Sequence, residues 1–193
     1  MVGRPINELR VGDSAETVRL VSRAVIAEYV DAVNDLNPLH SDDEFAAKTS
    51  FGRPIAPGLW TAGLISGVIG GKLPGPGSLY VSQQLSFLKP VLMGDTITAR
   101  VEVAEVIPER NRVRLKTICV NQRGEEVLSG EAWVKPPKTR IVYADHGAEP
   151  GIPLAHPWFW GAAAVQAWGA IARLTLEKWR GACGAHHTPG TEG

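Results

Sequence analysis

Residues 57–72 read PGLWTAGLISGVIGGK, an apolar stretch that carries its only charge at the last position. Proline suits the start of a helix, where its missing N–H leaves no hydrogen bond unmade. The apolar side chains that follow would lie on nearly every side of a helix, and such a helix belongs in the middle of a core. Glycines within it lower the helix propensity but allow close approach of other backbone. The stretch therefore predicts a buried central helix.

On the C-terminal side of this helix the pattern changes to alternation with a period of two residues. Turn signals rich in Pro, Gly, Asp and Asn separate the alternating segments, and short connections predict antiparallel neighbours. A further alternating segment precedes the helix. The predicted strands lie at residues 15–21, 78–87, 95–107, 112–121 and 126–134. The economical architecture is an α+β fold, in which an antiparallel five-stranded sheet curls around the central helix.

On the N-terminal side, residues 22–34 carry apolar side chains at helical spacing, which predicts a helix that ends just before Asp35. Pro38 moves the residue before it out of the α region, so the chain turns there. Residues 41–44 (SDDE) are typical of a capping box that starts a second, short helix. Asp35 and His40 therefore flank a tight turn between two helices, which can bring both side chains to one pocket.

The residue types around this turn are suited to proton transfer. A carboxylate and an imidazole, here Asp35 and His40, can share such a task. Gly58, at the start of the apolar helix, offers a backbone N–H and the positive end of the helix dipole to a developing oxyanion. Ser66 supplies a hydroxyl two turns further along. On their own the acid and the imidazole also fit an ordinary surface turn, and Ser66 can bond a carbonyl one turn back.

A longer run of sequence favours the chemical interpretation. The chain contains DLNPLH at residues 35–40 and FAAKTSFGRPIAPG at residues 45–58, and the matching text continues to residue 103. From about residue 10 to residue 136 the chain resembles a MaoC-like hot-dog domain of the (R)-specific enoyl-CoA hydratase type. The resemblance implies a hot-dog fold, in which the five-stranded sheet wraps around the buried helix. It stops at about residue 136, and the pattern beyond that point predicts a C-terminal helical extension.

The resemblance also implies roles for individual residues. Asp35 and His40 match the catalytic dyad, Gly58 the oxyanion donor and Ser66 an active-site serine. The implied reaction is the reversible syn hydration of a trans-2-enoyl-CoA to the (R)-3-hydroxyacyl-CoA, with no metal and no redox cofactor. Pro57 departs from the pattern, because many relatives have a histidine before the oxyanion glycine.

Two other classes of function stay open. One is another hot-dog chemistry, such as 3-hydroxyacyl-acyl-carrier-protein dehydratase or thioesterase, although thioesterases generally lack the DxNPLH run. The other is a non-catalytic acyl-thioester-binding subunit, which we expect to have lost the dyad. The resemblance to the MaoC-like hydratases also implies a homodimer with two active sites near the interface.

Bulk properties indicate a soluble cytoplasmic enzyme. The chain has 193 residues with 20 basic and 20 acidic side chains, so nothing points to nucleic acid or another polyanion. Two cysteines give no disulfide framework, and the first residues form no apolar signal segment.

The C-terminal part has a different character. We expect a hot-dog domain at residues 1–136, a Pro-rich linker at 137–156, and an amphipathic helix with a tail at 157–193. Four of the six tryptophans lie in this last segment, which indicates that it covers a surface. That surface is its own dimer, a partner protein, or a lipid or polyester granule. The apolar stretch is too short for a transmembrane segment.

Overall fold

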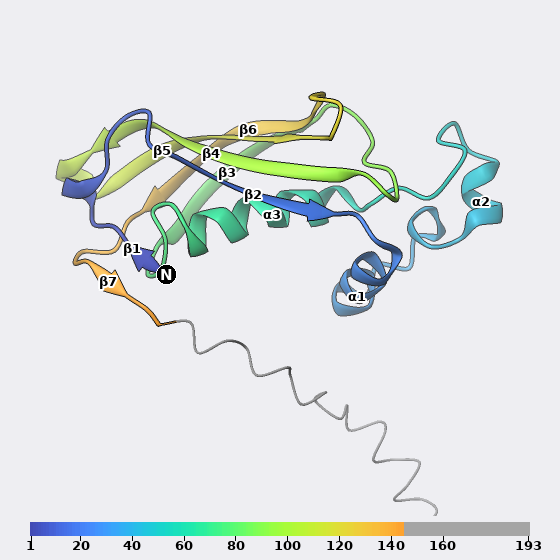
Figure 1. Cartoon of the computed structure of the whole chain (residues 1–193), viewed down its shortest axis with the longest axis horizontal. Helices are drawn as coiled ribbons and strands as arrows, with labels where there is room; N and C mark the ends of the chain where they lie inside the picture. The colour runs from blue at the N-terminus through green and yellow to red at the C-terminus, as the bar shows by residue number, and fades with distance from the viewer. Residues whose placement is uncertain (145–193) are drawn as a thin grey trace, which may run out of the picture. The chain divides into compact units, whose positions relative to one another are not determined.

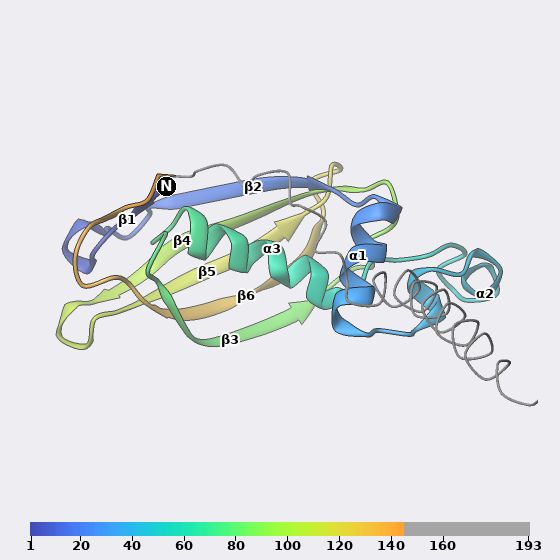
Figure 2. The ribbon, with the colours of Figure 1, turned by 90° about the horizontal axis from the view of Figure 1, so that it is seen from below.

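The computed structural model describes residues 1–144, in which a five-stranded antiparallel sheet curves around helix α3, Gly58–Gly71 (Figures 1 and 2). The strand order across the sheet is β2-β4-β5-β6-β3. The strands are β2 (Ser14–Leu20), β3 (Leu79–Phe87), β4 (Thr96–Ile107), β5 (Arg112–Val120) and β6 (Glu126–Lys135). The α+β hot-dog architecture expected from the sequence is confirmed, and each predicted strand is found to within two residues of its predicted ends.

The core lies between the concave face of the sheet and one side of α3. Alternate side chains of the central strands are fully buried there, as the period of two residues predicts. They include Ile97, Ala99, Val101 and Val103 on β4, and Val113, Leu115 and Cys119 on β5. Burial raises the pKa of the Cys119 thiol to about 12, so this cysteine stays protonated and serves as a small apolar side chain.

Helix α3 is central, as expected, but only one of its sides is buried within the single chain. The side chains of Trp60, Thr61, Ile65, Val68 and Ile69 face the sheet. Leu59, Ser66 and the glycines at positions 63, 67 and 70 are exposed. The physical reason is that one sheet can cover only one side of a helix, so the other side of α3 remains open.

The helices before α3 also follow the sequence pattern closely. Helix α1 (Arg23–Val33) begins at Ser22, whose hydroxyl accepts from Val25 N–H, and it ends at Asn34 in the left-handed conformation. Helix α2 spans Asp43–Ala47. Its N-cap is Asp42, whose carboxylate accepts from Phe45 N–H at 2.9 Å, and not the first residue of the predicted capping box.

A small second sheet was not expected from the sequence. Strand β1 (Val2–Gly3) pairs with β7 (Ile141–Val142), which lies beyond residue 136 in the stretch predicted as a linker. A Cβ atom at Gly3 would lie 2.0 Å from the Pro76 carbonyl oxygen, so this residue must lack a side chain. Two short 3₁₀ helices, η1 (Ile6–Glu8) and η3 (Pro108–Arg110), complete the elements outside the site.

Residues from 145 onward lie outside the described part, and with them the rest of the predicted linker, the Trp-rich helix and the tail. Residues 1–144 form a compact unit of their own. None of the helices within this unit is long and apolar enough to cross a membrane.

Because residues 1–144 form a compact unit of their own, we expect the chain truncated after Ala144 to fold and to melt cooperatively. Truncation after Pro136 removes β7 and the ion pair between Arg140 and Glu8. It is expected to lower the midpoint by about 5 °C, since roughly 1 kcal/mol corresponds to a few degrees in a domain of this size. Circular dichroism melting curves measure the midpoints of both truncated proteins. An insoluble 1–144 protein would contradict the prediction.

Candidate active site

Asp35 precedes the 3₁₀ turn η2 (Pro38–His40), and His40 is the last residue of that turn. The turn belongs to the segment between α1 and α2, which lies near the end of the sheet at which α3 begins (Figures 1 and 2). His40 Nε2 is 3.6 Å from Asp35 Oδ2. The His40 side chain is 9% exposed and that of Asp35 is 33% exposed. The turn thus brings the two predicted residues together and leaves the carboxylate accessible to solvent.

Local hydrogen bonds orient the Asp35 carboxylate. Its Oδ1 atom accepts from Asn37 N–H at 3.2 Å, and the Asn37 side chain accepts from Leu39 N–H at 3.1 Å. Both are side-chain turns of the kind that Asp and Asn form readily. Pro38 fixes the first position of the 3₁₀ turn. With Oδ1 occupied by the backbone, Oδ2 is the atom that faces the imidazole.

The imidazole of His40 is oriented by a backbone carbonyl. Its Nδ1 atom lies 2.8 Å from the oxygen of Ile55, and Ile55 N–H donates to Leu39 O at 3.2 Å. Since a carbonyl oxygen can only accept, Nδ1 must carry a hydrogen. In the neutral ring, Nε2 therefore holds the lone pair, and this atom points toward Asp35. His40 can take up and release a proton at Nε2 while its ring stays fixed.

Gly58 is the first residue of α3, so its N–H has no carbonyl one turn back within the helix. None of the hydrogen bonds within residues 1–144 uses this N–H. A Cβ atom here would come within 2.8 Å of the Phe87 ring. Glycine at this position lets the ring pack against the helix start and leaves the N–H unobstructed.

A pocket of about 270 Å³ opens beside this helix start. Its lining is mostly apolar and includes Ile55, Ala56, Gly58, Thr61, Phe87 and Val127. A second cavity of about 150 Å³ is lined by His40 itself, together with Ile26, Val30 and Ser41. Ile55 connects the two halves of the site, because it lines the first pocket and holds the His40 ring through its carbonyl.

Of the four predicted site residues, the structure brings Asp35 and His40 into contact, and Gly58 lines the neighbouring pocket. Ser66 is joined to neither. It lies on the open side of α3, and it is not among the residues that line the 270 Å³ pocket. Among residues 1–144, no group of three His, Cys, Asp or Glu side chains is arranged to hold a metal ion.

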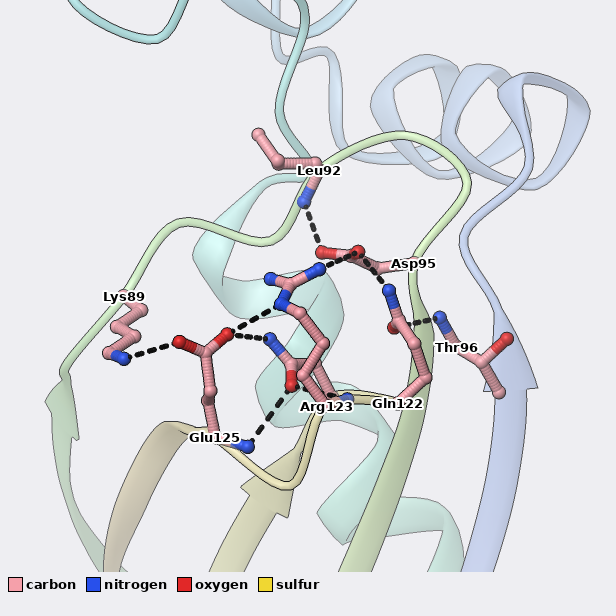
Figure 3. A network of polar contacts seen from close by, with 8 residues as sticks. Lys89, Leu92, Asp95, Thr96, Gln122, Arg123 and Glu125 are labelled. Carbon is pink, nitrogen blue, oxygen red and sulfur yellow. Dashed lines mark hydrogen bonds and ion pairs between the residues drawn. The ribbon is translucent and has the colours of Figure 1, made fainter.

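Sequence analysis missed a polar network at the edge of the pocket (Figure 3). Lys89, which lines the pocket, donates to Glu125 at 2.7 Å. Asn121 and Arg123 donate to the same carboxylate, each at 2.8 Å. These hydrogen bonds hold the pKa of Glu125 at about 2. No sequence pattern predicts this network, because Lys89 is more than thirty residues away in the chain from the β5–β6 turn that carries the other three residues.

The sequence was also compared with known proteins. A family model described as MaoC like domain matches residues 8–125. The chain belongs to the MaoC-like family. The 3-hydroxybutyryl-CoA dehydratase of Methylorubrum extorquens is 48% identical over 131 residues, which are 68% of this chain and 83% of the relative. The (R)-specific enoyl-CoA hydratase of Aeromonas caviae is 43% identical over 129 residues, which are 67% of this chain and 96% of the relative.

Solved structures agree with this assignment. The unliganded R-hydratase PhaJ1 from Pseudomonas aeruginosa superposes with a TM-score of 0.71 at 38% identity. The match covers 74% of this chain and 92% of that chain. The protein is therefore an enzyme of the hydro-lyase class, a hydratase or dehydratase with the MaoC-like fold.

The low pKa of Glu125 gives a stability prediction. Its folded value of about 2 lies below the ordinary value of 4.5, so the ionised carboxylate stabilises the fold. This contribution is fully present above about pH 5 and is lost as the pH falls toward 2. We therefore expect Glu125→Gln to be less stable than wild type near pH 7, by an amount that shrinks below pH 4.5.

Urea unfolding at a series of pH values measures this difference. Glu109→Gln is the matched control, because Glu109 makes no ion pair within residues 1–144. If the free energy of unfolding of Glu125→Gln stayed below that of wild type by a constant amount down to pH 3, the assigned role of the carboxylate would be refuted.

Proposed function

We propose that this enzyme adds water reversibly to a trans-2-enoyl-CoA to give the (R)-3-hydroxyacyl-CoA. The observation that carries the proposal is the Asp35–His40 pair, in which Nε2 and Oδ2 face each other at 3.6 Å. The names of the Methylorubrum and Aeromonas relatives describe the two directions of this kind of reaction. The same pair serves both directions, because a base in one direction acts as the acid in the other.

In the proposed hydration, a water molecule binds between Asp35 Oδ2 and His40 Nε2. The pair removes one proton from this water as its oxygen bonds to C3 of the substrate. The π electrons of the C2–C3 bond move toward the thioester, which acquires enolate character. A proton is then returned from the pair to C2, so the net change is the addition of one water. The carboxylate orients the water and stabilises the imidazolium.

The developing enolate oxygen needs a hydrogen-bond donor. Gly58 N–H is free within the described residues and stands at the positive end of α3, so we assign it to this oxygen. The 270 Å³ pocket beside it is apolar, which suits an acyl chain. Ser66 is proposed as an additional active-site serine that acts from the open side of the helix.

The dyad is tested by substitution. We expect Asp35→Asn and His40→Gln each to lower kcat for hydration of crotonyl-CoA by about 10²–10⁴-fold, the range for loss of acid–base catalysis. Ser66→Ala should show a smaller defect. Asp31→Asn, one turn earlier on α1, is the matched control and should retain full activity. Loss of the enoyl-thioester absorbance measures the rates, and circular dichroism checks the fold.

Near wild-type turnover in either dyad variant would overturn the mechanism. The same assay separates the alternative functions. A carrier-protein dehydratase would prefer crotonyl-carrier protein to crotonyl-CoA, and a non-catalytic subunit would bind the thioester without turnover by the wild-type chain.

We also propose that two copies of the chain form a homodimer along β3. This strand is an edge of the sheet and pairs only with β6 among residues 1–144. Its exposed side chains include Leu79, Tyr80, Val81 and Phe87. The strand contains no Lys and no Pro, which commonly protect a free edge. An antiparallel pairing of two β3 strands is self-complementary, as a two-fold dimer requires.

The dimer is tested by placing a charge on this edge. We expect Val81→Lys to shift the protein to monomers in size-exclusion chromatography with light scattering, because the ammonium group would be buried against its own copy. Val18→Lys is the matched control on β2, the opposite edge of the sheet, and should remain dimeric. A dimeric Val81→Lys protein, or a monomeric wild type, would exclude this interface.

We further propose a cytoplasmic role in acyl-CoA or fatty-acid metabolism. The support is the CoA thioester substrate proposed above and the expectation that two cysteines give no disulfide framework. Residues 157–193 are proposed to dock on the enzyme's own dimer, on a partner protein, or on a lipid or granule surface.

A further inference from the structure

We infer that Asp95 is a positioning residue for His40. It acts through the backbone of two intervening segments, residues 91–93 and residues 54–56. Asp95 directly precedes β4, and its side chain is only 3% exposed. It takes no part in the proposed proton transfer. Its consequence for activity rests on the proposed function, whereas its effect on the His40 ring does not.

The carboxylate of Asp95 is fully engaged. Oδ2 accepts from Leu92 N–H at 2.9 Å, and Oδ1 accepts from the Gln122 amide at 2.8 Å and lies 3.5 Å from the Arg123 guanidinium (Figure 3). A buried carboxylate is tolerated only with such partners. The bonds join the turn before β4 to the turn between β5 and β6.

The bond to Leu92 closes a tight turn. Asp95 N–H donates back to Leu92 O at 3.0 Å, and Gly94 within the turn has a φ of +92°. The carboxylate and the backbone of Asp95 thus hold both polar groups of Leu92. These two hydrogen bonds fix the path by which residues 91–93 enter the turn.

Residues 91–93 in turn hold residues 54–56. Leu92 forms an antiparallel bridge with Ile55, and Ala56 N–H donates to Val91 O at 2.8 Å. The carbonyl of Ile55 is the group that accepts from His40 Nδ1 at 2.8 Å. A continuous series of hydrogen bonds therefore runs from the Asp95 carboxylate to the imidazole of the dyad.

Residues 88–95 form the loop between β3 and β4, and its first residues are also held by the β5–β6 hairpin. Lys89 donates to Glu125 at 2.7 Å, and Leu88 N–H donates to Val127 O at 2.9 Å. The loop that lines the pocket is thus attached at both ends, at Lys89 and at Asp95. Removing the Asp95 carboxylate leaves Leu92 N–H without its acceptor and detaches this end from the β5–β6 turn. The end then keeps only backbone bonds, such as that from Gly94 N–H to Val21 O at 2.8 Å, and the Ile55 carbonyl can move away from His40. The ring would then lose the contact that places the hydrogen on Nδ1.

The chain contains a second turn of the same construction, which supplies a matched control. Asp13 precedes β2 and accepts from Arg10 N–H at 2.9 Å, while Asp13 N–H donates to Arg10 O at 3.0 Å. Gly12 has a φ of +90°. Both turns read Gly-Asp followed by a hydroxyl residue, GDS at 12–14 and GDT at 94–96. No hydrogen bond described for the Asp13 turn leads to the segment that holds His40.

The test compares Asp95→Ala with Asp13→Ala in the full-length protein. We expect Asp95→Ala to lower kcat for crotonyl-CoA hydration by about 10- to 100-fold with KM changed less than about threefold, because a catalytic group displaced by about 1 Å can cost this much. Asp13→Ala should keep the wild-type kcat. Gln122→Leu, which removes one of the partners and keeps the carboxylate, should give an intermediate kcat.

Nitrogen-15 NMR of the His40 ring gives a readout that does not depend on turnover. In wild type and Asp13→Ala we expect the hydrogen of the neutral ring on Nδ1, and in Asp95→Ala a mixture of the two tautomers. An unchanged ring signal in folded Asp95→Ala would overturn the inference. If Asp95→Ala fails to fold, an unchanged ring signal and kcat in Gln122→Leu overturn it instead. A wild-type enzyme without hydratase activity would refute the proposed function while leaving the NMR test valid.

Discussion

The burial of one side of α3 against the concave sheet is the constraint on which the other features depend. Val68, Ile65 and Ile69 are nearly inaccessible to water, and the alternate side chains of β4 and β5 that oppose them are equally buried. Burial of this kind supplies most of the free energy that holds a domain together. It also fixes where α3 begins, and that point carries Gly58 and the pocket beside it.

The site itself is held by backbone atoms more than by side-chain pairs. Asp35 is oriented by Asn37 N–H, and His40 is oriented by the carbonyl of Ile55. A backbone partner leaves Oδ2 and Nε2, the atoms to which we assign the proton transfer, free for water and substrate. It also makes the geometry of the dyad depend on the loop that pairs with Ile55, and through that loop on Asp95.

The exposed side of α3 and the unpaired edge of β3 are the two surfaces of the domain at which a second copy of the chain could bind. A sheet can cover one side of a helix, and the sequence nevertheless places Leu59 and several glycines on the other side. The apolar edge of β3 ends at Phe87, whose ring packs against Gly58. A second copy bound along β3 would therefore lie close to the start of α3, where the chemistry is proposed.

Local sequence patterns were sufficient to predict the main sheet, its helices and the proximity of Asp35 to His40. Alternation of period two located the five strands, and Pro38 with its neighbours located the turn that joins Asp35 to His40, because these signals act over a few residues. Only the tertiary structure showed the Ile55 carbonyl on His40, the Asp95 network, the β1–β7 pair and the exposed side of α3. Each of these joins residues that are far apart in the chain or uses backbone atoms that every residue has. Local sequence patterns predict neither long-range contacts nor contacts made by backbone atoms, because both depend on how the sheet curves around α3.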